Sequence, residues 1–278
     1  MVQRLLSDLA EELSASDNHW NAYHRRWAQL RPPLRPNDEI VSAFRDAIAG
    51  QEERVLLLGV TRELADLGRA TIAVDRNEAM IKHIWPGDTA RRRAQHGEWL
   101  SLPLPDRSVT AAIGDGSLSA VTYPDEQRTL LNELARVLRP RGIVALRIFA
   151  TPEEGETLAQ VQRSALDGRI KSFHAFKWHV AMAIATEQGN ANVAVAAILD
   201  AVNALFPDRE QLAAATGWSD QDIATIDVYR GSKEVYGFPT LTQLRAILPP
   251  SFEPLQVSPS GTYPLAERCP IVSARVRG

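Results

Sequence analysis

Short apolar runs alternate with amphipathic stretches between residues 37 and 150. The runs that read as strands lie at 54–58, 71–74, 109–113 and 143–149, with a weaker one around 95–100. Strands that alternate with helices along a chain are typical of a parallel sheet covered on both faces. The pattern therefore predicts an α/β fold with a Rossmann-like, doubly wound and mostly parallel sheet.

The segments between the apolar runs carry helix signals. Asn37 is a favourable N-cap for a helix whose apolar face holds Ile40, Phe44 and Ile48 at spacings of four residues. A longer helix is predicted to begin near Pro124, because proline is well tolerated in the first turn, where its missing N–H is not needed. Helices at these positions would cover the sheet.

The pattern changes beyond residue 150. Strand signals disappear over 151–235, where alanine-rich helical patterns predict a helical insert that caps the fold. Two late strand candidates, 253–257 and 271–276, are expected to pair as a C-terminal antiparallel hairpin at the sheet edge. We thus expect an N-terminal helical segment (1–36), an α/β core (37–150), a helical cap insert (151–235) and the end of the core (236–278).

Composition narrows the function classes. A chain of 278 residues with 45% hydrophobic residues can bury a substantial core, which excludes disorder throughout. The 31 basic and 34 acidic residues give a net charge of −3, so no global field attracts nucleic acid, and we expect no nucleic-acid partner. The run Arg91, Arg92 and Arg93 is interpreted as a solvated turn.

The cysteine count and the apolar runs indicate the cellular compartment in which the protein is expected. One cysteine, Cys269, allows no internal disulfide and no thiolate-rich metal site, so a reducing, cytoplasmic setting and no metal are expected. Asp8 and Glu11 interrupt the N-terminal apolar run, and the richest later run, 193–199, stops at Asp200. The sequence therefore predicts no targeting segment and no membrane segment.

Three residues at strand ends are candidates for a binding crevice. Gly59 follows the first strand, Asp75 ends the second, and Gly114 follows the fourth. In open α/β sheets, ligands lie beyond the carboxyl ends of the strands, where glycine admits close backbone approach and a carboxylate accepts hydrogen bonds from ribose hydroxyls. This layout predicts a nucleoside-type cofactor, although Asp75 is also compatible with a residue that simply starts the next helix.

Four stretches carry a family resemblance when taken together in this order. They are Val-Leu-Leu-Leu-Gly at 55–59, Ala-Val-Asp at 73–75, Leu-Pro-Leu-Pro-Asp at 102–106 and Leu-Ala-Arg-Val-Leu-Arg-Pro-Arg-Gly at 134–142. With them the chain resembles the class I methyltransferases that use S-adenosylmethionine, over roughly residues 37–150 and the last forty. The resemblance implies S-adenosylmethionine as cofactor and methyl transfer to a small-molecule acceptor.

The resemblance also implies roles for individual residues. Asp75 would hold the ribose hydroxyls, and Arg76 and Met80 would flank the adenine. Glu98 would accept a hydrogen bond from the adenine amino group, and the backbone N–H of Trp99 would meet the ring. Two alternatives remain open, since Met80 also suits the core face of its helix and Trp99 also suits packing beneath the loop.

Further implied residues lie around the reacting end of the cofactor. Asp115 would lie next to the sulfonium and methyl group, with a turn residue between two glycines as the alternative. Trp20, Tyr23 and Trp27 fall on one helical stripe, where Tyr23 would shield the sulfonium or, alternatively, all three would be core contacts. The predicted cap offers four aromatic residues as walls of an acceptor pocket: Phe173, Phe176, Trp178 and Trp218.

The glycine-rich loop departs from the family pattern. Gly59 is present, but Leu57 replaces a carboxylate, and Thr61 and Glu63 replace two later glycines. Thr61 places a Cβ where backbone normally crowds the methionine part of the cofactor, and Glu63 adds negative charge near the cofactor's carboxylate. An alternative function follows, namely a non-catalytic descendant of the fold that binds a nucleoside or a partner.

Two questions stay open at this level. His24, His174 and His179 are candidate general bases, but no carboxylate partner can be read from the sequence, so no catalytic base is predicted. A nicotinamide-dependent dehydrogenase shares the strand, glycine, helix, strand and aspartate order, but the absent G-x-G-x-x-G and the late hairpin disfavour it. The sequence makes no prediction of oligomeric state.

Overall fold

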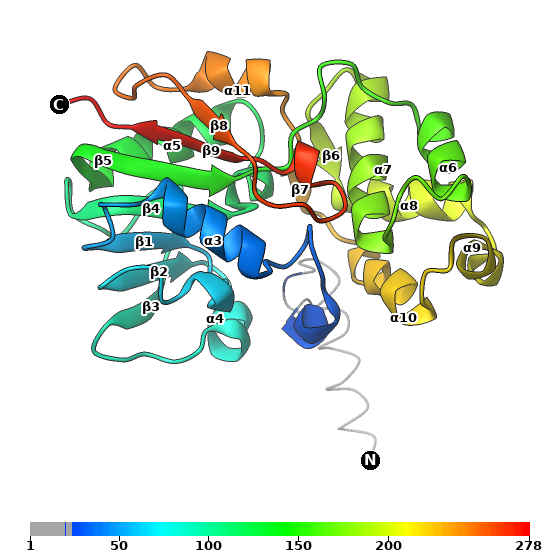
Figure 1. The fold of residues 1–278 in the computed structure, drawn as a ribbon, viewed down its shortest axis with the longest axis horizontal. Helices are drawn as coiled ribbons and strands as arrows, with labels where there is room; N and C mark the ends of the chain where they lie inside the picture. Colours follow the sequence, from blue (N-terminus) through cyan, green and yellow to red (C-terminus); the bar gives the residue numbers. More distant parts are fainter. Residues whose placement is uncertain (1–19, 21–23) are drawn as a thin grey trace.

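A seven-stranded sheet occupies one side of the molecule, beside a group of helices (Figure 1). The computed structural model describes residue 20 and residues 24–278. The strands are β1 (Val55–Leu58), β2 (Thr71–Asp75), β3 (Arg92–His96), β4 (Val109–Asp115), β5 (Leu138–Arg147), β8 (Gln256–Ser258) and β9 (Ile271–Arg275). Their order across the sheet is β3-β2-β1-β4-β5-β9-β8; β1 to β5 are parallel and β9 is antiparallel to both neighbours. The predicted mostly parallel α/β sheet with a C-terminal antiparallel hairpin is confirmed.

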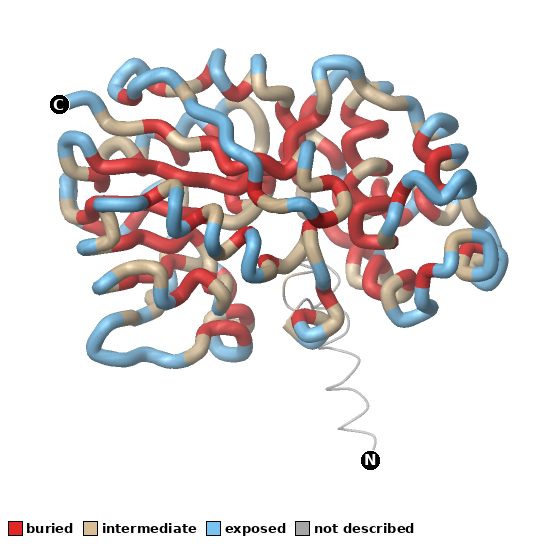
Figure 2. The backbone as a smooth tube through the Cα atoms, viewed as in Figure 1, coloured by how far each residue is buried: buried red, intermediate tan, exposed pale blue. Residues whose placement is uncertain are grey.

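Helices cover both faces of the sheet. They are α3 (Asp38–Ala47), α4 (Glu78–Ile84), α5 (Asp125–Val137) and α11 (Leu241–Ile247), with 3-10 turns η1 (His24–Gln29), η2 (Arg62–Leu64), η3 (Ser117–Ala120) and η5 (Ala266–Arg268). Asn37 caps α3 as predicted, because its side chain accepts a hydrogen bond from the Ile40 N–H at 3.1 Å. Val55 and Leu57 belong to the apolar cluster shared with α3 and α4. The alternate residues of β1 belong to the cluster shared with α5 and α11, so both faces are buried (Figure 2).

A second group of helices lies beyond one end of the sheet (Figure 1). This helical segment, residues 151–235, holds α6 (Leu158–Leu166), α7 (Phe173–Gln188), α8 (Val195–Leu205), α9 (Arg209–Thr216), α10 (Asp220–Ile223) and η4 (Ala224–Tyr229). Helix α7 is its centre, because 12 of its 16 residues are buried. A helix that is apolar on all sides is typical of a buried position.

Two expectations are wrong in detail. The strand β6 (Asn192–Ala194) lies where the pattern predicted only helix, and it pairs antiparallel with β7 (Val235–Gly237) at the predicted boundary of the insert. Three-residue strands are held by tertiary pairing and leave no periodic signal in the sequence. Arg92 and Arg93 lie in β3 rather than in a turn, and Arg92 pairs with Asp66. β3 is an edge strand, where charged side chains are common because they discourage pairing with another chain.

No helix in the described part of the chain combines the length and the apolarity that crossing a bilayer requires.

Candidate functional site

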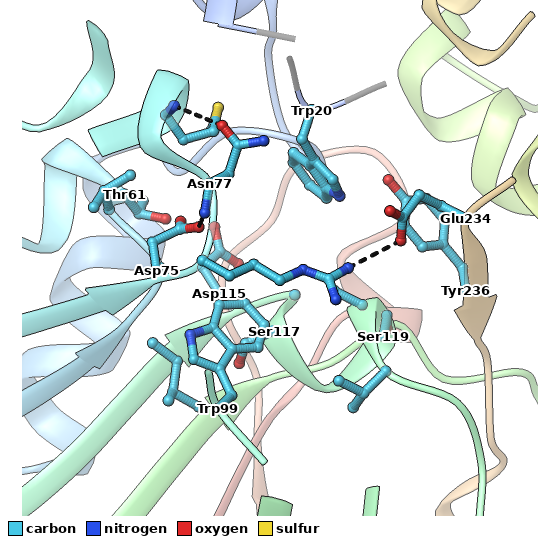
Figure 3. Close-up of a pocket in the computed structure, with 18 of the residues that line it drawn as sticks. Trp20, Thr61, Asp75, Asn77, Trp99, Asp115, Ser117, Ser119, Glu234 and Tyr236 are labelled. Atoms are coloured by element: carbon cyan, nitrogen blue, oxygen red, sulfur yellow. Dashed lines mark hydrogen bonds and ion pairs between the residues drawn. The ribbon is translucent and has the colours of Figure 1, made fainter. Parts of the chain in front are cut away.

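A cavity of about 420 Å³ opens at the carboxyl ends of β1, β2 and β4 and reaches the helical segment. All eight residues predicted to bind the cofactor line it: Gly59, Thr61, Asp75, Arg76, Met80, Glu98, Trp99 and Asp115. Figure 3 shows Asp75 and Thr61 on one side and Glu234 and Tyr236 across from them. The position and size are those of a small-ligand site in an open α/β sheet. We call the Asp75 side the nucleoside half and the Tyr236 side the acceptor half, after the ligands that the sequence analysis predicts there.

The carboxylate of Asp75 is held at the end of β2. Its Oδ1 accepts a hydrogen bond from the backbone N–H of Asn77 at 2.8 Å. Asn77, not Asp75, caps helix α4, because the Asn77 side chain accepts from the Met80 N–H at 2.9 Å. A Cβ built on Gly59 would lie 3.7 Å from Asp75 Oδ2, so the carboxylate borders the glycine turn. Gly59 itself has φ +86°, a conformation that favours glycine.

The environment of Asp75 changes its acidity. Burial raises its pKa to about 6, although the Asn77 N–H and the charge of Arg76 act in the opposite direction. The carboxylate is therefore mostly ionised at neutral pH and becomes protonated in mild acid. In its ionised form it is a strong hydrogen-bond acceptor for hydroxyl groups.

Trp99 and Arg76 form further walls of the nucleoside half. The indole N–H of Trp99 donates to the Val74 carbonyl at 2.7 Å, which fixes the ring beside Gly59. Arg76 Nη2 lies 3.1 Å from Glu234 Oε2, so an ion pair joins the end of β2 to the residue before β7 (Figure 3). Glu98 is exposed at the rim. Met80 both lines the cavity and belongs to the core, so its two interpretations describe the same position.

Asp115 is held by a residue that sequence reasoning missed. Arg147 is its neighbour in the sheet register, is fully buried, and donates from Nε to Asp115. Its other nitrogens donate to the Tyr263 hydroxyl at 3.0 Å and the Pro33 carbonyl at 2.7 Å. Burial is the largest single influence on the pKa of Arg147 and lowers it, but the charge and hydrogen bond of Asp115 together with Tyr263 and Cys269 raise it above its ordinary value, so the guanidinium stays charged. The sequence signal for this role was a charged residue, Arg147, inside the apolar run 143–149.

The glycine loop is closed by the N-terminal segment. Thr61 has φ −54°, outside the glycine-favoured region, and the single 3-10 turn η2 follows it. Glu63 accepts a hydrogen bond from Arg35 Nε at 2.7 Å and lies 3.4 Å from Trp27 Nε1. The expectation placed the charge of Glu63 near the cofactor; in the structure Arg35 neutralises it.

The acceptor half is aromatic. It is lined by Phe149, Trp178, Tyr236 and Trp20. The prediction of aromatic walls is correct for Trp178 and wrong for three others, which pack on one another inside the helical segment: Phe173, Phe176 and Trp218. Periodicity identified α7 as apolar but could not show which of its sides borders a cavity.

The remaining candidates lie elsewhere. Tyr23 falls outside the described residues. His174 Nε2 is 3.4 Å from the Gln29 carbonyl oxygen, and His179 Nδ1 is 2.9 Å from Glu156 Oε2; neither lines the 420 Å³ cavity. Within residue 20 and residues 24–278, no group of three or more His, Cys, Asp or Glu side chains is placed to hold a metal ion.

The sequence of the core matches a known family over the stretch that builds the nucleoside half. Residues 59–146 match the family model described as a methyltransferase domain. Over these residues the chain is similar to a methyltransferase domain. No curated protein sequence matches the chain.

Solved structures resemble this chain at low sequence identity. An S-adenosylmethionine-dependent methyltransferase from Methanosarcina mazei is 15% identical, covers 89% of this chain and 98% of its own, and has a TM-score of 0.48. The 1,6-didemethyltoxoflavin-N1-methyltransferase of Burkholderia thailandensis, solved with 1,6-didemethyltoxoflavin and S-adenosylhomocysteine, is 15% identical, covers 91% and 85%, and has a TM-score of 0.49. A putative zinc-dependent alcohol dehydrogenase from Rhodobacter sphaeroides is 11% identical, covers 92% and 98%, and has a TM-score of 0.55, a likeness of fold alone.

Proposed function

We propose that this methyltransferase domain binds S-adenosylmethionine and transfers its methyl group to a small-molecule acceptor. One observation carries the proposal: the eight residues assigned to the cofactor, which come from four separate loops and helices, line a single cavity with residues of the helical segment. Positions 59 and 115 are far apart in the sequence, so only the tertiary fold brings these residues to one cavity.

The residues of the nucleoside half suit an adenosine group. The ionised carboxylate of Asp75 would accept hydrogen bonds from both ribose hydroxyls, beside the turn at Gly59. Met80 and the ring of Trp99 offer apolar surface to the adenine, and Glu98 can accept from its amino group. The bound cofactor would supply an electrophilic methyl group on sulfur.

The protein's own contribution is positioning. Holding an acceptor in line with the methyl group and excluding water accelerates a bimolecular transfer without a dedicated base. Residues 151–235 would serve as the cap of the acceptor half, because Trp178 on α7 and Glu234 line the cavity opposite Asp75. The Arg76–Glu234 ion pair would hold this cap to the core.

Calorimetric titration of the protein with S-adenosylmethionine and S-adenosylhomocysteine tests the proposal. We expect both to bind one to one. Failure of both ligands to bind would overturn it. Binding of adenosine with no measurable contribution from the amino-acid part would favour the alternative of a non-catalytic nucleoside binder, which the replaced loop glycines at Thr61 and Glu63 support.

We expect Asp75→Asn to weaken S-adenosylhomocysteine binding by about 30-fold or more, since about 2 kcal/mol is lost with charge-assisted hydrogen bonds to the ribose. Because burial raises the pKa of Asp75 to about 6, affinity of the unmodified protein should fall as pH drops below 6, and the variant should lose that dependence. Titrations at pH 5 and pH 7.5 measure both effects. Asp46→Asn, an exposed change on α3, is the control. An Asp75→Asn affinity within twofold of the original would remove Asp75 from the site.

A further expectation concerns the loop at Thr61. Because Thr61 keeps a negative φ and only one 3-10 turn follows, the amino-acid part of the cofactor should add less than about 3 kcal/mol to the affinity of adenosine. Thr61→Gly should then strengthen S-adenosylhomocysteine binding and leave adenosine binding unchanged. Paired titrations of the two ligands check this. Weaker S-adenosylhomocysteine binding in Thr61→Gly would show instead that the threonine hydroxyl contacts the ligand.

A further inference from the structure

Four aromatic rings form a continuous row along the acceptor half of the cavity. The ring centroids of Phe149 and Trp178 are 5.0 Å apart, those of Trp178 and Tyr236 are 5.7 Å apart, and those of Tyr236 and Trp20 are 6.4 Å apart. The rings meet at interplanar angles of 46°, 76° and 56°, the tilted and edge-to-face arrangements that aromatic groups prefer. Figure 3 shows Trp20 and Tyr236 facing the cavity from two directions.

The row is assembled from segments that are distant in the sequence. Phe149 follows β5, Trp178 lies on α7, Tyr236 lies on β7, and Trp20 lies in the N-terminal segment. Where these segments meet, a hydrophobic core would need only apolar side chains of the right volume, aromatic or not. Here four different segments each place an aromatic ring on the same cavity, which is the surface that a planar aromatic ligand would complete.

Two buried polar atoms on this wall have no hydrogen-bond partner among the described residues. They are the indole Nε1 of Trp178 and the hydroxyl of Ser117, in side chains that are 4% and 2% exposed. By contrast, the indole N–H groups of Trp27, Trp85 and Trp99 each donate to an oxygen. Both residues line the cavity, and buried polar groups in proteins are nearly always paired, so a polar atom of a ligand or a water that reached them would supply the missing hydrogen bonds.

The charged groups of the acceptor half limit the kind of nucleophile. No histidine is among the described residues that line the cavity. Glu126 accepts hydrogen bonds from the Thr122 backbone and hydroxyl, which lower its pKa, and Glu234 pairs with Arg76. Because these two carboxylates are engaged, neither is a free base for an acceptor such as an aliphatic alcohol, which must lose a proton to react. A ring nitrogen carries its lone pair at neutral pH and needs none.

We propose, on the basis of the function proposed above, that the methyl acceptor is a planar heteroaromatic molecule methylated on a ring nitrogen. It lies against Phe149, Trp178 and Tyr236, and a second ring nitrogen or an oxygen accepts the hydrogen bond of the Trp178 indole. In the reaction the ring nitrogen forms the new N–C bond while the C–S bond breaks, and its electrons pass to sulfur as S-adenosylhomocysteine leaves. The positive charge moves to the acceptor and is relieved by loss of an N–H proton to water where one is present.

Three probes compare a planar heteroaromatic ring with its alternatives. Quinoxaline is planar with two neutral ring nitrogens, naphthalene has the same shape without them, and decahydroquinoxaline has two nitrogens in a non-planar ring system and is a cation at neutral pH. Each is titrated by ligand-observed NMR into protein saturated with S-adenosylhomocysteine. We expect quinoxaline to bind at least threefold more tightly than either of the others.

Two variants test the indole. Trp178→Phe keeps a ring and removes the N–H, so it should weaken quinoxaline binding at least threefold and leave naphthalene and S-adenosylhomocysteine binding unchanged. Trp218→Phe, a tryptophan packed against Phe173 and Phe176 away from the cavity, is the control and should change none of the three.

The outcomes distinguish the two proposals. The heteroaromatic acceptor would be wrong if protein that binds S-adenosylhomocysteine failed to bind quinoxaline or bound decahydroquinoxaline equally well. It would also be wrong if Trp178→Phe left quinoxaline binding unchanged. Each of these results would leave the proposed function standing. Absent S-adenosylhomocysteine binding overturns the proposed function itself.

Discussion

Replacing Arg147 with methionine should lower the free energy of unfolding by about 3–5 kcal/mol. Arg147 is fully buried, and its guanidinium donates to Asp115, Tyr263 and the carbonyl of Pro33. Methionine fills similar apolar volume but leaves the buried carboxylate of Asp115 without a counter-charge. Removing one partner of a buried ion pair is costly because the other remains desolvated and unpaired. Urea unfolding at pH 7 measures the loss.

Two controls show whether the uncompensated charge is the cause. The double variant Arg147→Met with Asp115→Leu removes both charges and should recover most of the stability, as apolar replacements of buried pairs often do. Arg128→Met breaks an exposed pair with Asp125 on α5 and should change the free energy of unfolding by no more than about 1 kcal/mol. A loss below about 1 kcal/mol for Arg147→Met would show that Asp115 does not depend on this partner.

Lys177→Met should stabilise the protein at neutral and acidic pH, by up to about 5 kcal/mol. The ammonium of Lys177 is fully buried in the helical segment, 3.2 Å from the Thr225 hydroxyl and near the rings of Phe173 and Tyr229. Burial lowers its pKa from 10.5 to about 7, against the opposing charge of Asp222. Its neighbour on α7, His174, adds no charge at pH 7, because burial lowers its pKa to about 4.

The sign of the pH dependence follows from these values. The folded protein binds the proton of Lys177 more weakly than the unfolded chain does. The free-energy cost of keeping Lys177 buried is therefore complete below pH 7 and disappears as pH rises from 7 to 10.5. Lys177 thus makes the free energy of unfolding increase over that range. Unfolding in urea at pH 6, 8 and 10 should show the increase in the original protein and not in Lys177→Met. The exposed change Lys171→Met should keep it, and an identical slope in all three proteins would contradict the assignment.

The nucleoside half could be located from the sequence because it depends on where apolar runs end. Gly59 and Asp75 directly follow buried strands, and the carboxyl ends of neighbouring parallel strands meet at one edge of a sheet. The acceptor half depends on which side of a helix that is buried nearly all round borders a cavity, and periodicity does not show this for α7. Trp178 was identified only among three companions that lie inside the helical segment.

The sequence also did not predict the ion pairs between segments that are distant in the chain. Arg147 stood in an apolar run, and the role of Glu63 depends on Arg35, 28 residues earlier. A spacing pattern records local geometry, whereas these pairs join segments that only the tertiary fold brings together. The same limit applies to β6 and β7, which pair across more than forty residues.

The contact of Glu63 with Arg35 and Trp27 makes the two halves of the cavity interdependent. Arg35 lies over the ring of Trp27 at 5.9 Å, and Trp27 and Trp20 both line the cavity. The residue that replaces a loop glycine thus anchors the segment that supplies aromatic surface to the other ligand. Glu63→Gly would give the loop a family-like glycine. The same change would remove the contacts of Glu63 with Arg35 and Trp27, which hold the N-terminal segment against the loop. Under the proposed function, a change at this one position would therefore affect both the loop that borders the cofactor and the segment that borders the acceptor.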